Sequence, residues 1–148
     1  MTNLRAAAAI LLVAPVLGAC ETGTSATDDA SPSQEAVDLA QVRETCMTET
    51  AETLKVYTDE LTGGQFFELS ADGETLQMVT PAPVQEVTRA VAHFASQCAF
   101  REAGAPADLV DRLAVPASGE QSGGWTGFTG TWESDAEQGF RASVKVAH

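Results

Sequence analysis

The stretch Val84-Gln-Glu-Val-Thr-Arg-Ala-Val-Ala-His-Phe-Ala-Ser-Gln-Cys98 carries the clearest pattern in the chain. Its larger apolar residues recur at steps of three and four, which is the spacing of one face of an α-helix. Pro81 and Pro83 precede the stretch and Gly104 follows it, and these residue types are typical of helix starts and ends. The sequence therefore predicts a helix whose buried stripe consists of Val84, Val87, Val91, Phe94 and Cys98.

Two further helices are predicted, one on either side of this helix. The upstream helix begins at Ser31, where Ser-Pro-Ser-Gln offers an N-cap serine with proline at the first helical position. Its apolar residues keep helical spacing as far as Leu61, and the glycine pair 63–64 then ends it. Because its threonines are weak helix formers, a break or a strand after Cys46 stays open as an alternative. The downstream helix begins at Pro106, and its inner side consists of Leu109, Val110 and Leu113.

Alternation of apolar and polar residues predicts strands in the remaining segments. Residues 65–69 and 75–79 flank a turn-forming sequence, as in a β-hairpin. Residues 125–133 and 140–146 alternate in the same way, which predicts a second antiparallel pair with one buried and one solvated face. The sheet is therefore expected to be small and antiparallel.

The solvated face of the second pair is the expected interaction surface. On this face, Glu133 and Arg141 are expected to pair across the two strands. The segment 117–124 that precedes the pair is expected to be a flexible connection. The glycine-rich segment 119–130 lacks the lysine and the spacing of a phosphate-binding loop, so its glycines are expected to make tight turns between strands. The residues of the solvated face are Thr129, Thr131, Glu133, Arg141, Ser143 and Lys145.

Cys46 and Cys98 are expected to form a disulfide. Both lie on the apolar stripes of predicted helices, and they form an even pair if Cys20 is lipid-modified in an oxidising compartment. A bridge between residues 52 positions apart stabilises the fold by about 4 kcal/mol in the chain-entropy model. The alternative is a free buried pair, since no histidine or carboxylate is spaced to complete a metal site with these cysteines.

The first 20 residues determine the expected compartment. Arg5 gives a short segment its positive charge, and residues 6–17 form an uncharged apolar run. Twelve residues suit the core of a signal peptide, whereas a membrane-spanning helix needs about 20. The sequence Leu17-Gly-Ala-Cys20 resembles the lipobox of bacterial lipoproteins, which makes Cys20 the expected lipid-modified first residue of the mature protein. An ordinary secretory signal that is cut before Cys20 is the alternative.

Charge excludes one class of partner. Residues after Cys20 contain all 21 acidic residues but only seven of the eight basic residues, a net charge of −14. Such a surface repels nucleic acid and anionic lipid headgroups, so we expect no nucleic-acid partner. The acidic residues are expected mainly to keep an alanine-rich protein soluble.

No catalytic, metal or cofactor signature is found in the sequence. A Ser–His or Cys–His arrangement requires a histidine, and of the two in the chain His93 lies off the apolar stripe and is expected to be solvated. No serine lies in a G-x-S-x-G motif, and no segment matches a calcium-binding loop. Acidic pairs that are expected to be solvated surface are Glu49/Glu52, Asp108/Asp111 and Asp135/Glu137. Aromatic residues that are expected to be core rather than ligand-binding are Trp125, Phe128 and Trp132.

A series of short motifs follows the helix that ends at Cys98. They are Gly104-Ala-Pro106, Leu109-Val110, Trp125-Thr-Gly-Phe128, Thr131-Trp132 and Gly139-Phe140. With these motifs the segment 46–146 resembles a domain of exported proteins and lipoproteins of high-GC actinobacteria. Relatives place a His-Pro-Asp-like turn after the second tryptophan, where this chain has Glu133-Ser-Asp-Ala-Glu-Gln. The resemblance implies a small Cys-paired α+β fold and export, and it implies no activity.

We therefore expect a lipoprotein signal peptide over residues 1–19, a lipidated cysteine and flexible tether over 20–30, and a single α+β domain over 31–148. The domain is expected to have two to three helices packed on one face of a small antiparallel sheet. A palmitate-bearing anchor on Cys20 would hold it at the extracytoplasmic face of the cell membrane.

The expected function is a non-enzymatic binding or interaction module of the cell envelope, with another envelope protein as the candidate partner. The alternative is a carrier for a small apolar ligand held between the helices and the sheet. An envelope hydrolase is the third hypothesis. No cofactor is expected.

Overall fold

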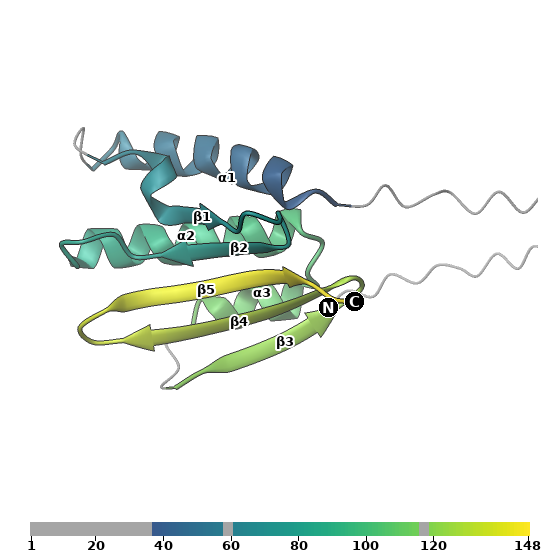
Figure 1. The fold of residues 1–148 in the computed structure, drawn as a ribbon. Helices are drawn as coiled ribbons and strands as arrows, with labels where there is room; N and C mark the ends of the chain where they lie inside the picture. The colour runs from purple at the N-terminus through teal and green to yellow at the C-terminus, as the bar shows by residue number, and fades with distance from the viewer. Residues whose placement is uncertain (1–36, 58–60, 116–118) are drawn as a thin grey trace, which may run out of the picture. The chain divides into compact units, whose positions relative to one another are not determined.

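The computed structural model describes residues 37–57, 61–115 and 119–148. In this part of the chain, three α-helices lie on one face of a five-stranded antiparallel sheet (Figure 1). The predicted α+β fold class is therefore confirmed. In chain order the elements are α1 (Leu39–Leu54), the 3₁₀ turn η1 (Gly63–Phe66), β1 (Phe67–Leu69), β2 (Thr75–Val79), α2 (Glu86–Glu102), α3 (Ala107–Leu113), β3 (Gln121–Trp125), β4 (Phe128–Asp135) and β5 (Gly139–Val146).

The strand order of the sheet is β1-β2-β5-β4-β3. Both predicted hairpins are present: Phe67 lies opposite Met78 in the first, and Glu133 lies opposite Arg141 in the second. β2 pairs with β5, which joins the two hairpins into one sheet. Because side chains alternate along a strand, every strand contributes residues to both faces of this sheet.

α2 runs behind the sheet in the view of Figure 1 and packs mainly on β5 and β2. It begins after Gln85, whose N–H donates to Thr88 Oγ1 at 2.8 Å. It ends at Glu102, and Gly104 then adopts a φ of +79°, as expected for a glycine that terminates a helix. The predicted helix and its end at Gly104 are confirmed.

The buried stripe of α2 differs from the predicted stripe. Val91 and Cys98 are buried as expected, whereas Val84 lies before the helix, and Val84, Val87 and Phe94 are only half-buried. The positions that face the sheet are mostly small residues, which allow the helix axis to lie close to the strands. The larger residues Val87 and Phe94 therefore lie toward α1. The small buried residues are Ala92, Ala95, Ser96 and Ala99.

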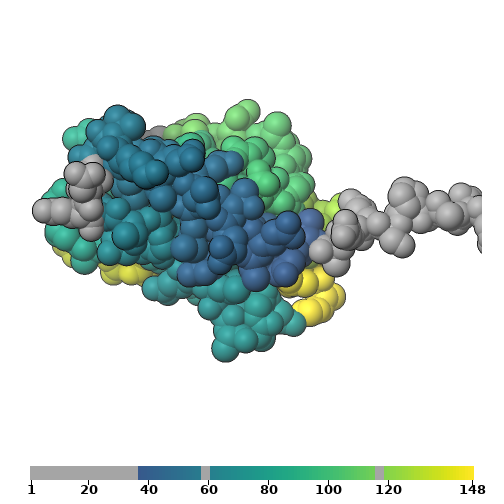
Figure 2. All heavy atoms as spheres, turned by 90° about the horizontal axis from the view of Figure 1, so that it is seen from above, coloured from purple at the N-terminus to yellow at the C-terminus, as the bar shows by residue number. Residues whose placement is uncertain are grey.

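α1 is shorter than the predicted helix at both ends. It begins at Leu39, because Asp38 is extended and its carboxylate accepts the Ala40 N–H at 2.8 Å as an N-cap; the predicted start at Ser31 lies outside the described residues. It ends at Leu54 rather than continuing to Leu61. In Figure 2, α1 lies across the face of the domain in blue.

The segment after Cys46, for which the sequence left both a helix and a strand open, is helical. The chain stays helical to Leu54, and two of its threonines bond back to the preceding turn: Thr48 Oγ1 donates to the Glu44 carbonyl oxygen and Thr53 Oγ1 to that of Glu49, both at 3.1 Å. Gly63 then lies against the backbone of Met47, where an added Cβ has no room. The chain has therefore already reversed direction before it reaches this glycine.

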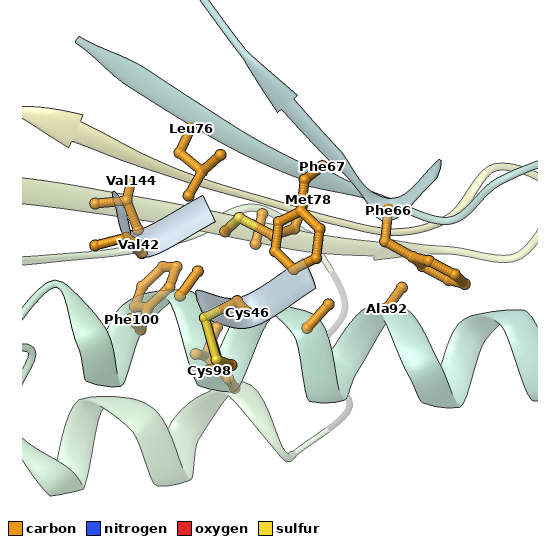
Figure 3. Packing of buried hydrophobic residues seen from close by; sticks show 14 of the residues in the cluster. Val42, Cys46, Phe66, Phe67, Leu76, Met78, Ala92, Cys98, Phe100 and Val144 are labelled. Atoms are coloured by element: carbon orange, nitrogen blue, oxygen red, sulfur yellow. A yellow bond between two sulfur atoms is a disulfide. The ribbon is translucent and has the colours of Figure 1, made fainter. Parts of the chain in front are cut away.

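The predicted disulfide between Cys46 and Cys98 is present and joins α1 to α2. The two Cα atoms lie 5.7 Å apart, within the usual range for a disulfide. Both cysteines are buried among core residues from the helices and the sheet, including Met78 and Phe100 (Figure 3). The bridge fixes α1 beside the helix that covers the centre of the sheet.

β3 was not predicted: the glycine-rich segment was expected to be a flexible connection, but Gln121–Trp125 pairs along its whole length with β4. Its glycines serve close packing. At Gly123 a Cβ would collide with the side chain of Leu109 on α3, and at Gly130 on β4 it would collide with the ring of Phe100. These two glycines allow α3 and the end of α2 to approach the sheet.

Candidate functional site

The outer face of the sheet, on which none of the helices in the described residues packs, is the candidate functional site (Figure 1). It contains residues from all five strands. Most of them are exposed, and the remainder are half-buried. The side chains of the outer face include those of Glu68, Thr75, Gln77, Val79, Ser122, Thr129, Thr131, Glu133, Arg141, Ser143 and Lys145.

One row of polar side chains crosses the whole outer face. Glu68, Gln77, Ser143, Thr131 and Ser122 are neighbours in register, with one residue from each strand. The hydroxyls of Thr131 and Ser143 lie 2.9 Å apart and form a hydrogen bond. The row thus offers a carboxylate, an amide and hydroxyls, which are groups that can donate to and accept from a polar partner.

Opposite charges flank this row. Glu133 lies opposite Arg141 on one side, and Lys145 lies opposite Thr129 on the other. A depression of only about 160 Å³ is lined by Gln77, Thr131, Glu133, Arg141 and Ser143 among others. This volume is below the range of roughly 300–1,000 Å³ that is usual for small-molecule sites. The outer face is therefore suited to contact with a surface rather than to enclosing a ligand.

Two aspartates hold the turns at opposite ends of the sheet. The Ser70 hydroxyl donates to Asp72 Oδ1 at 2.5 Å and the Glu74 N–H donates to it at 3.0 Å; these bonds lower the pKa of Asp72. The N–H groups of residues 137–138 both donate to Asp135 Oδ1 at 2.7 Å and lower the pKa of Asp135. Both carboxylates therefore stay ionised and fix the turn shape at either end of the outer face.

The inner side of the sheet is filled by aromatic side chains. Trp132 is 3 % exposed and Phe128 is 7 % exposed, and the half-buried Trp125 donates its indole N–H to the Ala103 carbonyl oxygen at 2.8 Å. The ring of Phe100 contacts both tryptophans, with centroid distances of 5.4 and 6.0 Å. The interpretation of these aromatics as core is confirmed.

His93 does not lie where the sequence analysis placed it. It was expected to be solvated, but its ring is half-buried with its centroid 3.8 Å from that of Phe140, and Nδ1 donates to the Leu113 carbonyl oxygen at 3.1 Å. The residue lies off the predicted apolar stripe, yet Phe140 of β5 packs against its ring and the end of α3 covers it. Burial lowers the pKa of His93, against the opposing effect of the hydrogen bond to Leu113. The neighbours of this ring are a phenyl group and a carbonyl, and neither is a catalytic partner.

In contrast to His93, the acidic pairs lie on the surface, as expected. Glu49 forms an ion pair with Arg101 at 2.9 Å, while Asp108 and Asp111 are exposed on α3. Within residues 37–57, 61–115 and 119–148, no three histidine, cysteine or acidic side chains are grouped so as to hold a metal ion. Within the same residues, none of the helices is both long and apolar enough to cross a membrane.

The predicted signal peptide, the lipidation site Cys20 and the tether all lie outside the described residues. Comparison of the chain with protein-family models, with curated proteins and with solved structures gave no match. The function must therefore be argued from the geometry and chemistry of this chain.

Proposed function

We propose that the protein is a lipid-anchored binding module of the cell envelope that contacts a protein partner through the outer face of its sheet. The observation that carries the proposal is that all three helices of the described chain pack on the same side of the sheet. Among the described residues, no helix covers the other side, which is a mostly polar surface. An antiparallel sheet tolerates such a solvated face, which is then free to bind.

The size of the outer face supports this role. Five strands at about 4.8 Å spacing make it roughly 24 Å wide, and the eight residues of β4 or β5 make it up to about 27 Å long. The resulting footprint, at most about 650 Å², approaches the roughly 800 Å² that each partner contributes to a standard protein–protein interface. Its mixed charges would give specificity more than affinity.

The membrane anchor rests on the N-terminal sequence. Two or three acyl chains at Cys20, each methylene worth about 0.8 kcal/mol, would hold the protein stably in the membrane on its extracytoplasmic side. Cells that express the chain should incorporate labelled palmitate into it, and Cys20→Ala should abolish both incorporation and processing. Absence of label from the wild type would remove the anchor from the proposal.

The binding role is tested by site-specific photo-crosslinking in the native cell. A photoreactive amino acid at Thr129, exposed on the outer face, should give a discrete adduct with one partner. The same replacement at Thr48, an exposed threonine of α1, is the matched control and should not give that adduct. An adduct that forms equally from both positions, or from Thr48 alone, would contradict the assignment of the outer face.

A further inference from the structure

A groove of about 690 Å³ runs between the C-terminal end of α1 and the N-terminal half of α2. Thr53 and Tyr57 line it from the α1 side, and Val87, Ala90 and Phe94 line it from α2. It lies in the helical layer, on the other side of the sheet from the outer face. The inference below is therefore independent of the function proposed above.

The larger apolar side chains that line this groove are only partly covered. Val87 and Phe94 belong to the apolar stripe of α2 but are only half-buried, while Tyr57 is 65 % exposed. The fully buried residues of α2 are mostly alanines together with Val91, Cys98 and Phe100, while Val87 is a half-buried residue at the edge of this core. Aromatic and branched side chains that are grouped and left uncovered are typical of a surface that binds a partner.

The shape of the groove indicates what kind of partner fits. The groove is open along its length, so any occupant keeps one side in water. A wholly apolar ligand would leave that side exposed at a cost, whereas an amphipathic helix has a polar side to place there. Gln85 to Phe94 spans nine helical steps, about 13.5 Å or two and a half turns. A partner helix would insert residues at positions i, i+3 or i+4, and i+7.

The negative charge at the groove and of the whole chain indicates which helices would bind. Glu86 is exposed at one end of the groove and forms no ion pair with any of the described residues. The chain as a whole has a net charge of −13, which attracts cationic segments and repels a second copy of itself. A self-association through this groove would also bring two copies of Glu86 near each other.

We infer that this groove binds an amphipathic helix whose polar side is basic. Its apolar residues pack on Val87, Ala90 and Phe94, and a lysine or arginine near one end pairs with Glu86. The partner is thus defined by chemistry: two to three turns of helix with an apolar stripe and positive charge.

The test is a titration of the full chain with an 18-residue model helix composed of leucine and lysine. Ala90→Arg fills the floor of the groove and adds a positive charge at an exposed helical position, so it should weaken binding at least tenfold. Ala107→Arg makes the same change at an exposed alanine of α3 and should alter affinity less than twofold. Thermal unfolding of both variants checks that the fold is retained.

Two further probes separate the groove from general charge attraction. A serine–lysine peptide of equal charge should bind at least tenfold more weakly than the leucine–lysine helix. Glu86→Gln, which removes the charge without adding bulk, should weaken the leucine–lysine helix several-fold even if Ala90→Arg fails to fold. Equal effects of the two arginine variants, equal binding of the two peptides, or a dimer that Ala90→Arg disperses would each overturn the inference.

Discussion

The inner and outer faces of the sheet differ in what covers them, although the same strands form both. On the inner face, Trp132 and Val144 are 3 % and 0 % exposed beneath the helices. One residue away along the same strands, Thr131 is half-buried and Lys145 is exposed, and no helix of the described segments packs over them. Under the proposed function, stability therefore depends on the inward-facing residues of a strand, and binding depends on the outward-facing residues that alternate with them. Single substitutions at neighbouring positions should therefore separate the two.

The largest expected effect is the loss of an inner aromatic residue. Trp132→Ala removes a buried indole that packs edge-on against Phe100 and should lower the free energy of unfolding by about 3–5 kcal/mol. Thr131→Ala, on the adjacent outer position, should cost well under 1 kcal/mol. Urea denaturation measures both. If Trp132→Ala leaves the free energy of unfolding unchanged, the inner face is not the core, and the two faces do not differ in their contribution to stability.

Next in size is the bridge that holds the helical layer together. Replacing Cys46 and Cys98 with serine should cost about 2–4 kcal/mol, because the unfolded chain regains the freedom of a 52-residue loop. A non-reducing peptide map of the protein isolated from its native cell should show the two cysteine peptides linked. Free thiols at both positions, or a double-serine variant as stable as the wild type, would show that the helical layer does not depend on this bridge.

Substitution of glycines in the sheet is expected to change the free energy of unfolding by a smaller amount. Gly130→Ala should cost about 1–3 kcal/mol, because the new Cβ meets the ring of Phe100. Gly124→Ala is the control, since its nearest neighbour would be the Phe128 carbonyl oxygen at 3.9 Å and its position is exposed. We expect Gly124→Ala to be neutral in the same denaturation measurement. Equal losses at both glycines would show that strand pairing rather than contact with α2 determines the cost.

The smallest expected effect is a pH dependence that comes from His93. Burial lowers its pKa below the ordinary 6.5, so the folded protein holds the neutral ring and unfolding takes up a proton. Its contribution to stability is fully present above pH 6.5 and is lost as the pH falls from 6.5 toward the lower folded pKa. His93→Gln should flatten this part of the stability curve, measured by urea denaturation between pH 7.5 and 5. An unchanged slope in the variant would show that His93 titrates as a solvated residue.

Several elements were predictable from local pattern. Helical spacing identified α2 and its end at Gly104, and strand alternation identified the residues of β4 and β5 that face inward. The position of Cys46 and Cys98 on two apolar stripes predicted their disulfide. These features were accessible because each depends on a repeat of 3.6 or 2 residues, which the chain carries in its own order.

The candidate site was accessible only in part. Thr129, Thr131, Arg141 and Lys145 were assigned to a solvated face from alternation alone. The extension of this face over β2 and β3 required the strand order, since Gln77 and Ser122 become its neighbours only through pairing with β5 and β4.

By itself, the sequence determined which residues alternate, because alternation depends on positions close along one element. It also indicated that Cys46 and Cys98 can pair, because each lies on the apolar stripe of its own helix. The tertiary structure decided what covers each face. His93 is half-buried because α3 folds over it, and Gly123 lies in a strand because β4 supplies its hydrogen-bond partners and Leu109 needs the space. In the same way, Phe94 lines a groove rather than the core because α2 contacts both the sheet and α1. Periodicity defines the apolar side of a helix, but only the packed neighbours determine which part of that side remains open.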